Sequence, residues 1–148
     1  MPSHPTLTPQ VIGQAEKTLN AILFRLRAGP GLTEAQWITL TLTAVGGGAV
    51  GRGQLVGQVA HGLKVSDARA RAHLAELAAA RLIQDPGDDA GIVRITAAGE
   101  EAYERIRAAV TQATRRLWGD LPAEDLATAG RVLSIITERA NAELAGAT

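Results

Sequence analysis

The chain of 148 residues contains no cysteine. This absence excludes disulfide bonds, thiolate catalysis, cysteine-ligated zinc and thiol-based redox sensing, and it fits a reducing cytoplasm. No apolar run approaches the roughly 18 residues that cross a bilayer, and the N-terminus lacks the basic and then apolar pattern of a secretion signal. We therefore expect a cytoplasmic protein that makes no membrane contact.

Neither sign of charge predominates, because 15 Lys and Arg residues are balanced by 15 Asp and Glu residues. The net charge therefore does not indicate a nucleic-acid partner, and any electrostatic argument must rest on where the charges lie. The chain also lacks low-complexity tracts and long charge runs. With 46% hydrophobic residues it can form a core, so we expect a single domain over residues 1–148.

Motifs of enzymes and metal sites are missing as well. The three histidines, His4, His61 and His73, include no pair at the i, i+4 spacing that binds a metal on one helix face. The clustered glycines after residue 45 form neither a GxxxxGK[ST] loop nor a GxGxxG turn. Ser66 and Ser134 lack the His and Asp context that activates a nucleophile. We expect no catalytic activity, no metal and no cofactor.

Two helices are predicted in the N-terminal part, after a frayed arm at residues 1 to 8. Thr8 and Pro9 form a good helix start, and the first helix should run from about 9 to 28. Its apolar stripe consists of Val11, Ile12, Ala15, Leu19, Ile22, Leu23 and Leu26. The second helix, about 34 to 45, opens with a Thr33/Gln36 capping box.

The six glycines between 46 and 57 predict a weak element. A third helix is expected at about 54 to 62, without a capping side chain and with an interior glycine, which costs about 0.5 to 1 kcal/mol relative to Ala. A short turn at 62 to 65 then leads to Ser66, which is placed to cap a fourth helix from Asp67 to about Ala80.

The fourth helix has two distinct faces. Ala70, Leu74 and Leu77 share one side at helical spacing and should face the core. The other side carries Ala68, Ala72, Ala75 and Ala79, flanked by Arg69 and Arg71. Alanines permit close approach to a major groove, and the arginines can reach guanine edges or phosphates. The alternative is an alanine-rich helix that is simply solvated. The position of this helix, after a helix and a tight turn and before a hairpin, favours a DNA-binding role.

A β-hairpin follows, with strands at 82–84 and 92–95 and with Arg94 pointing outward. Thr96 should cap a long helix from 97 to about 118, and a last helix should span about 122 to 144. The three long amphipathic helices carry more apolar surface than a compact winged helix can cover. The sequence thus predicts a mainly α fold with a small β-hairpin wing: a winged helix-turn-helix over about 34–96, with dimerisation helices at about 9–28 and 97–144.

This arrangement resembles the multiple-antibiotic-resistance regulator (MarR) family of bacterial repressors. The resemblance rests on LTEAQW at 32–37, VAHGLKVS at 59–66, LAELAAARLI at 74–83 and VRITAAG at 93–99. It implies a homodimer that binds double-stranded DNA at a palindromic operator and is released by a small aromatic or anionic ligand.

Two positions depart from the family pattern. An Asp-Arg-Arg turn is usual at the wing tip, but Asp88, Asp89, Ala90 and Gly91 stand here, so two carboxylates should repel DNA phosphates unless the wing stands off the duplex or Arg94 makes the contact. Arg81 replaces the usual glycine after the fourth helix, and we expect an ordinary helical conformation there.

The candidate site residues follow from this interpretation. Between residues 52 and 81 basic residues exceed acidic ones by three, since five face two. The residues expected at the DNA are Arg52, Lys64, Ser66, Asp67, Ala68, Arg69, Arg71, Ala72 and Arg94. The residues expected at an effector pocket are Phe24, Arg25, Trp37 and His61, with core packing as the alternative for Trp37.

The leading hypothesis is a homodimeric transcriptional repressor. The alternative is a winged-helix module for protein or ligand interaction that binds DNA weakly or not at all, which the acidic wing and the zero net charge favour. An enzyme is a distant third hypothesis.

Overall fold

The computed structural model describes residues 6–29 and 31–146. The first five residues of the expected N-terminal arm, and with them His4, lie outside the described part. By its internal contacts the chain forms two compact units, one extending to Val110 and the other beginning at Thr111, and each is treated by itself.

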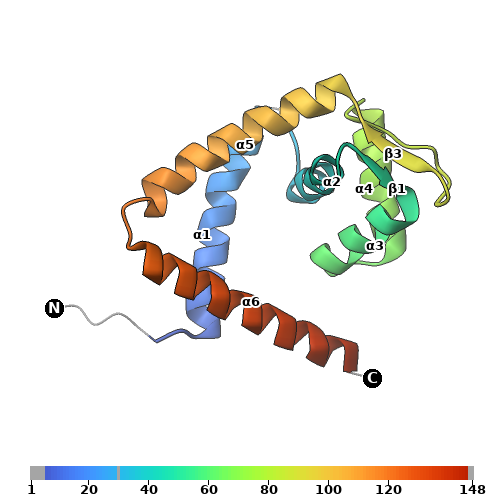
Figure 1. Ribbon diagram of the computed structural model, residues 1–148. Coiled ribbons are helices and arrows are strands. Elements are labelled where there is room, and N and C mark those ends of the chain that lie inside the picture. The colour runs from blue at the N-terminus through green and yellow to red at the C-terminus, as the bar shows by residue number, and fades with distance from the viewer. Residues whose placement is uncertain (1–5, 30, 147–148) are drawn as a thin grey trace. The chain divides into compact units, whose positions relative to one another are not determined.

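The described residues form six helices and one three-stranded antiparallel sheet, which confirms the predicted mainly α fold with a small wing (Figure 1). The helices are α1 (Pro9–Arg27), α2 (Glu34–Val45), α3 (Arg52–Leu63), α4 (Asp67–Ala79), α5 (Ala97–Trp118) and α6 (Ala123–Gly146). The strands are β1 (Ala49–Gly51), β2 (Ile83–Gln84) and β3 (Ile92–Ile95).

The predicted helix starts are present as hydrogen-bonded caps. Thr8 Oγ1 accepts the backbone N–H of Val11 at 3.1 Å, and Pro9 follows at the first helical position. Thr33 and Gln36 form both bonds of the capping box, each at 3.1 Å. Such caps satisfy N–H groups that the first helical turn leaves without a partner.

The glycine-rich segment contains a strand that the sequence analysis did not predict. Gly47 and Gly48 have φ values of 91° and 82°, a region that L side chains rarely adopt, and they let the chain turn directly from α2 into β1. β1 pairs antiparallel with β3, placing Val50 opposite Val93. Helix α3 then begins at Arg52, two residues earlier than expected.

Strand β3 is the centre of the sheet, with the order β1-β3-β2. On the other side of β3, Ile83 of β2 lies opposite Ile95. β3 has alternating burial, since Val93 is fully buried while Ile92 and Arg94 are exposed. The sheet therefore covers the core with one face and leaves Arg94 on the other.

The core is shared by the helices of the winged-helix part and the first half of α5. Leu40, Leu55, Leu74 and Ile106, from four different helices, are at most 1% exposed. The core face predicted for α4 is confirmed, since its buried residues are Ala70, Leu74 and Leu77. Despite its three glycines, α3 is held by Leu55, Val56 and Val59, all buried in this cluster.

The expectation for Arg81 was wrong. Its φ of 63° places it in the left-handed region rather than in an ordinary helical conformation. The backbone here ends α4 and enters β2, with the N–H of Leu82 donating to the carbonyl of Leu77 at 3.0 Å. Thr96 Oγ1 donates to the Arg81 carbonyl at 2.7 Å, so the turn is fixed from the far end of the wing. The usual glycine would adopt this conformation at lower cost.

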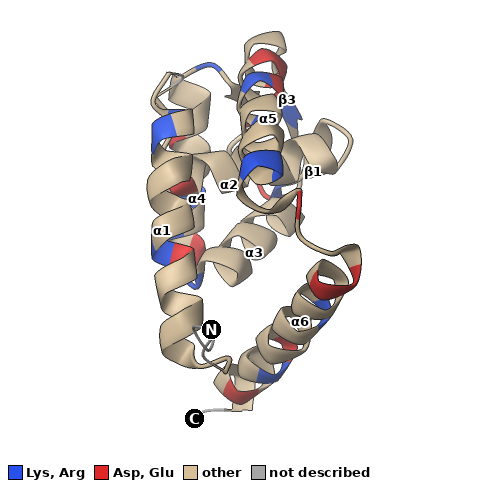
Figure 2. Ribbon diagram, turned by 90° about the vertical axis from the view of Figure 1, so that its left-hand side faces the viewer, with Lys and Arg blue, Asp and Glu red and all other residues tan. Residues whose placement is uncertain are grey.

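The last two helices are long and amphipathic. Thr96 Oγ1 accepts the N–H of Gly99 at 3.0 Å, as predicted for the start of α5. Helix α6 contains no buried residue, and its Leu133, Ile136 and Leu144 side chains are exposed. The ribbon colours in Figure 2 mark residues of both charge signs along α1, α5 and α6. No helix in the described ranges has the length and apolarity needed to cross a membrane.

Candidate nucleic-acid interface

The fourth helix presents its predicted outer face to solvent. Ser66 Oγ accepts the N–H of Arg69 at 3.1 Å and caps α4, and Asp67 lies in the first turn, where its negative charge complements the helix dipole. The four alanines of this face are Ala68, Ala72, Ala75 and Ala79, and all are exposed. Such an exposed ridge of methyl groups leaves room for the close approach of a large partner.

The turn between α3 and α4 is tight and well hydrogen-bonded. Lys64 has a φ of 59° and ends α3 in the left-handed conformation, and its N–H donates to the carbonyl of Ala60. The N–H of Val65 donates to the same carbonyl at 3.0 Å. Lys64 and Ser66 are exposed on this turn. The two helices therefore form the helix-turn-helix that the sequence predicts.

Arg52 does not belong to the exposed surface, which corrects its assignment as a DNA contact. Only 7% of the residue is exposed, and its Nε donates to Oδ1 of Asp85 at 2.7 Å. A second nitrogen, Nη1, donates to Asp89. The hydrogen bond that Arg52 donates to Asp85 is the main reason that the pKa of Arg52 is raised. Arg52 thus fixes the wing loop to the start of α3.

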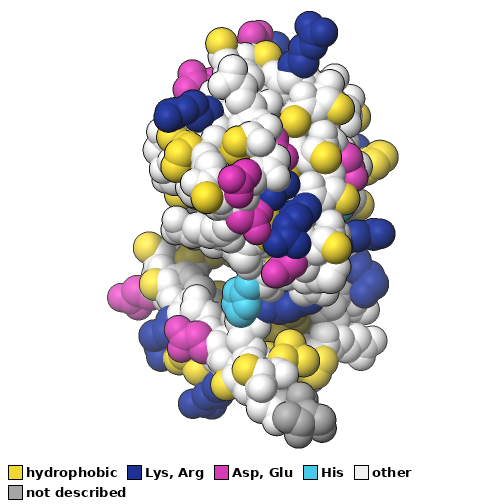
Figure 3. All heavy atoms as spheres, turned by 90° about the vertical axis from the view of Figure 1, so that its right-hand side faces the viewer, with side chains coloured by type: hydrophobic (Ala, Val, Ile, Leu, Met, Phe, Trp, Pro, Cys, Tyr) yellow, Lys and Arg dark blue, Asp and Glu magenta, His cyan; other side chains and the backbone are white. Residues whose placement is uncertain are grey.

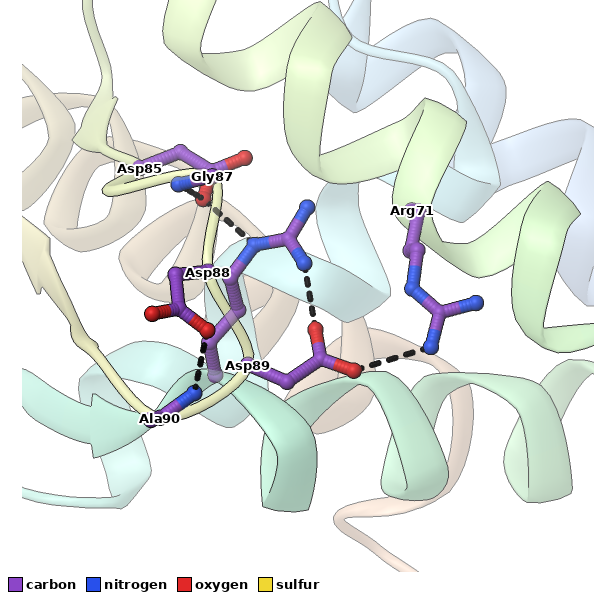
Figure 4. A network of polar contacts seen from close by, with 7 residues as sticks. Arg71, Asp85, Gly87, Asp88, Asp89 and Ala90 are labelled. Atoms are coloured by element: carbon purple, nitrogen blue, oxygen red, sulfur yellow. Dashed lines mark hydrogen bonds and ion pairs between the residues drawn. The ribbon is translucent and has the colours of Figure 1, made fainter.

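The wing tip is also different from the expected pair of free carboxylates. Asp89 lies between two guanidinium groups, because its Oδ2 accepts a hydrogen bond from Nη2 of Arg71 at 2.9 Å while its Oδ1 accepts one from Arg52 (Figure 4). The hydrogen bond from Arg71 is the main reason that the pKa of Asp89 is lowered. The same contact raises the pKa of Arg71. Half of the charge expected to repel phosphates is therefore paired within the protein.

The loop that carries these carboxylates is held by hydrogen bonds that its own backbone N–H groups donate to them. Asp85 Oδ1 accepts the N–H of Gly87 at 3.0 Å, and Asp88 Oδ1 accepts that of Ala90 at 3.1 Å (Figure 4). The N–H of Gly53 donates to the carbonyl of Asp89 at 3.1 Å. A side chain at position 53 would press on this carbonyl, with its Cβ at 3.3 Å. The wing tip therefore packs closely on the first turn of α3.

The charge of this face is balanced over short distances. Between residues 52 and 95 there are six basic and five acidic residues. Figure 3 shows some basic side chains beside acidic ones and others with no acidic neighbour on the visible face. Lys64, Arg69 and Arg94 are exposed, while Arg71 is half-buried against Asp89. The attraction for a polyanion is therefore local to the helix-turn, α4 and β3.

The residues expected at an effector pocket line neither of two cavities formed by described residues. Phe24, Arg25 and His61 are exposed, and 67% of Phe24 is accessible. Trp37 is stacked on Tyr103 of α5, with ring centroids 5.5 Å apart and an interplanar angle of 25°, and it packs against the core. For Trp37 the structure matches the alternative of core packing.

A cavity of about 340 Å³ lies elsewhere, between the end of α2, the turn before β1 and the start of α5. Its lining residues are Ala44, Gly47, Gly48, Ile95, Glu100, Tyr103 and Glu104. None of the four predicted effector residues is among them. Two carboxylates in this lining favour a neutral or cationic occupant over an anion.

Arg27 was missed by the sequence analysis. It is 4% exposed, and its Nε and Nη1 atoms are buried with no hydrogen-bond partner in the described residues. A buried guanidinium without a partner is costly, because its charge has left water without compensation. The signal was present in the sequence, since Arg27 continues the apolar stripe of Leu19 and Leu23 at four-residue spacing.

No group of three or more acidic or histidine side chains that could hold a metal ion occurs among residues 6–29 and 31–146. His73 Nδ1 lies 3.5 Å from Oε1 of Glu76, three residues later on α4. Glu76 also accepts a hydrogen bond from Gln36 at 2.8 Å, which is the main reason that its pKa is lowered. These polar contacts connect α4 to the start of α2.

Comparison with solved structures finds proteins of similar fold. No family model and no curated protein sequence matches the chain. A MarR protein from Peptoclostridium difficile aligns with a TM-score of 0.75 and 17% identity over 100% of both chains. A probable transcriptional regulator from Pseudomonas aeruginosa has 25% identity and a TM-score of 0.65, over 87% of this chain and 96% of that one. BpsR from Bordetella bronchiseptica, whose DNA binding is regulated by 6-hydroxynicotinic acid, has 21% identity and a TM-score of 0.68, covering 93% and 98%.

Proposed function

We propose that this chain, whose fold is that of the MarR-family winged-helix regulators, is a sequence-specific DNA-binding transcriptional regulator of the cytoplasm. It acts as a homodimer on a palindromic operator, and repression is the mode we propose. Helix α4 enters the major groove, and the exposed residues of the helix-turn and of β3 contact the flanking phosphates. The proposed DNA contacts are Lys64, Ser66, Asp67, Ala68, Arg69, Arg71, Ala72 and Arg94.

The observation that carries this proposal is the outer face of α4. A capped helix exposes an unbroken ridge of alanines with Arg69 on one side and Arg71 on the other, directly beside a three-stranded wing. A merely solvated helix needs no such ridge of small residues. Methyl groups that meet thymine methyls, together with guanidinium groups that reach guanine edges or phosphates, account for all of these residue types at once.

Dimerisation is supported by the surface of α6. This helix has 24 residues and none of them is buried, although Leu133 and Ile136 are 41% and 38% exposed on one side. An amphipathic helix gains most of its stability from covering its apolar face. A second copy of the chain would provide that cover, and two-fold symmetry would match a palindromic operator.

A test of dimerisation compares Leu133→Glu/Ile136→Glu with Arg131→Glu, which changes charge on the opposite side of α6. Light scattering after size-exclusion chromatography should give a dimer for the wild type and for the control. The double variant should shift to monomer. A wild-type monomer at micromolar concentration, or a double variant that remains dimeric, would contradict the proposed role of α6.

DNA binding is tested with the full chain by selecting duplexes from a random library and measuring affinity by fluorescence anisotropy. Enrichment of a palindrome is expected, and Arg69→Ala/Arg71→Ala should abolish its preference over a scrambled duplex. With 6 to 10 phosphate contacts in the dimer, affinity should fall roughly 10³- to 10⁵-fold between 50 and 200 mM salt. Unchanged binding by the double variant would contradict the assignment of α4.

An anionic aromatic effector is supported by Arg27. Two nitrogens of its buried guanidinium have no partner in the described residues, and a carboxylate would satisfy them with charge-assisted bonds. BpsR, of similar fold, is regulated by an aromatic acid. We propose the same class of ligand here, with Arg27 rather than the exposed Arg25 as its charge partner.

This effector proposal is tested by thermal unfolding with 6-hydroxynicotinic acid and 4-hydroxybenzoic acid as probes. Binding to the folded state raises the melting temperature, by mass action. The shift should vanish in Arg27→Met and persist in Arg25→Met. A shift that survives Arg27→Met would place the anion elsewhere, and no shift with either probe in the wild type would remove this ligand class.

The alternative function, a winged-helix module for interaction with protein or ligand, is favoured by two observations. The arginine on the wing side of the ridge is already paired with Asp89, and the local charge is nearly balanced. A stable dimer that enriches no sequence, and whose weak duplex binding does not change with salt, would favour this alternative over regulation of transcription.

A further inference from the structure

The two arginines that flank the alanine ridge of α4 are in different electrostatic states. Arg69 is exposed and forms no ion pair with the described residues. Arg71 donates from Nη2 to Asp89 at 2.9 Å, and its side chain is 42% exposed. The two residues flank the same ridge of one helix. A partner bound there would meet an unpaired cation at Arg69 and a neutral ion pair at Arg71.

This difference matters for phosphate binding. An arginine that contacts a phosphate releases counterions from the DNA, which makes affinity fall with salt. The Arg71–Asp89 pair is neutral as a unit, so its approach to a phosphate is opposed by the carboxylate and gains little from counterion release. Arg69 has no such carboxylate within bonding distance and is suited to the phosphate backbone.

Base reading makes a different demand on an arginine. It needs free N–H donors held in a fixed direction, because bidentate bonds to the O6 and N7 atoms of guanine require the planar fork to be in place. An arginine has five N–H donors, and the pair uses one of those of Arg71. The Arg71 side chain is 42% exposed, so further donors can reach a bound partner.

Asp89 is itself held firmly enough to direct Arg71. Its other carboxylate oxygen accepts from Arg52, which is 7% exposed and also bonded to Asp85. Its carbonyl accepts the N–H of Gly53 at 3.1 Å. The carboxylate is therefore anchored through both its side chain and its backbone to the start of α3 (Figure 4).

We propose that Asp89 is a positioning residue that fixes Arg71 to read a base edge in the major groove, while Arg69 contacts the phosphate backbone. This inference rests on the proposed DNA binding and adds a division of labour between the two arginines. It assigns a function to the acidic wing tip: the carboxylate sets specificity instead of repelling the duplex.

The experiment measures the affinity of the full chain for its selected palindrome and for a scrambled duplex, each between 50 and 200 mM salt. Arg71→Ala should reduce the ratio of the two affinities by roughly 5- to 150-fold per half-site and leave the salt slope unchanged. Arg69→Ala is the matched control, and it should weaken both duplexes alike and reduce the slope by about 2 in a dimer.

Asp89→Asn should lower the same affinity ratio and steepen the salt slope by about 2 per dimer, because Arg71 is then free to bind phosphate. A loss of structure alone would not steepen the slope. Since Asp89 also contacts Arg52, folding of this variant is checked by circular dichroism. Arg71→Lys leaves the Asp89–Arg52 contact in place. This variant should lower the ratio of the two affinities without changing the salt slope.

Three results would overturn the inference. If Arg71→Ala reduces the salt slope as much as Arg69→Ala and leaves the ratio intact, Arg71 is a phosphate contact. If folded Asp89→Asn retains the wild-type ratio and slope, Asp89 does not position Arg71. If the wild type binds neither duplex, the proposed function itself fails and this inference falls with it, which separates that result from the first two.

Discussion

The Nε atom of Arg52 lies 2.7 Å from Oδ1 of Asp85, and each side chain is only 9% exposed. The pair joins the first residue of α3 to the residue that follows β2, although 33 positions separate them in the chain. It fixes the start of the wing loop against the helix-turn-helix. The position of the wing loop relative to α3 therefore depends on this contact.

Replacing Arg52 by Ala should lower the free energy of unfolding by about 2 to 4 kcal/mol, because it leaves the Asp85 carboxylate buried without its partner. The matched control is Arg105→Ala, which breaks a pair with Glu101 whose side chains are 63% and 73% exposed. The control should lose less than about 1 kcal/mol. Urea unfolding at neutral pH measures both, and equal losses would show that the Arg52 pair is not effectively buried.

Two glycine-to-alanine substitutions should have opposite signs. A Cβ at Gly99 would lie 2.1 Å from the carbonyl oxygen of Leu82, so Gly99→Ala should destabilise by about 2 to 3 kcal/mol. A Cβ at Gly57 would meet nothing within 4 Å, so Gly57→Ala in α3 should stabilise by about 0.5 to 1 kcal/mol. Thermal unfolding distinguishes the two, and a destabilised Gly57→Ala would indicate that the exposed side of α3 is covered in the assembled protein.

Arg81→Gly should stabilise the chain. The left-handed conformation at Arg81 costs a residue with a Cβ about 1 to 2 kcal/mol. Glycine avoids this cost, but its greater conformational entropy in the unfolded state offsets part of the gain. We expect a net gain of about 0.5 to 1 kcal/mol in chemical unfolding. Arg81→Ala keeps the Cβ and serves as the control without a gain. A loss of stability in Arg81→Gly would be the result expected of an ordinary helical conformation.

The contribution of Asp89 to stability should depend on pH. Arg71 and Arg52 lower the pKa of Asp89 in the folded state, so its contribution is complete above the usual Asp range near 4 and is lost as the pH falls through the lowered value. The charged groups around it are Arg52 from α3, Arg71 from α4 and Asp85 from its own loop.

The measurement is the difference in stability between the wild type and Asp89→Asn. This difference should shrink as the pH is lowered from about 5 toward 2. In an Arg71→Ala background the same difference should depend less on pH, because the main cause of the lowered pKa has been removed. A difference that stays constant with pH in the wild-type background would mean that the pairing is absent in solution.

Local features of the fold could be predicted from the sequence. Caps at Thr33, Ser66 and Thr96 involve partners within three residues, so the sequence pattern contains the whole interaction. The buried face of α4 also follows from helical spacing alone, as do the bounds of the long helices to within a few residues.

The missed features depend on partners that are distant in the chain. β1 is a strand because β3, more than 40 residues later, pairs with it, and a glycine-rich segment gives no periodicity that would indicate this. Arg52 looked like an exposed cation because Asp85 is not near it in sequence. The exposed face of α4 follows from helical spacing, whereas at the wing tertiary contacts decide which charges remain exposed, and these contacts are not visible in the sequence.

The short strands on either side of β3 have a consequence for association. β1 has three residues and β2 has two, so the outer edges of the sheet expose few backbone groups to another chain. Long flat edges are the usual template for strand addition and aggregation. This sheet is a poor template, and copies of the chain are expected to associate through helical faces and to resist fibril formation even when the wing is fully exposed to solvent.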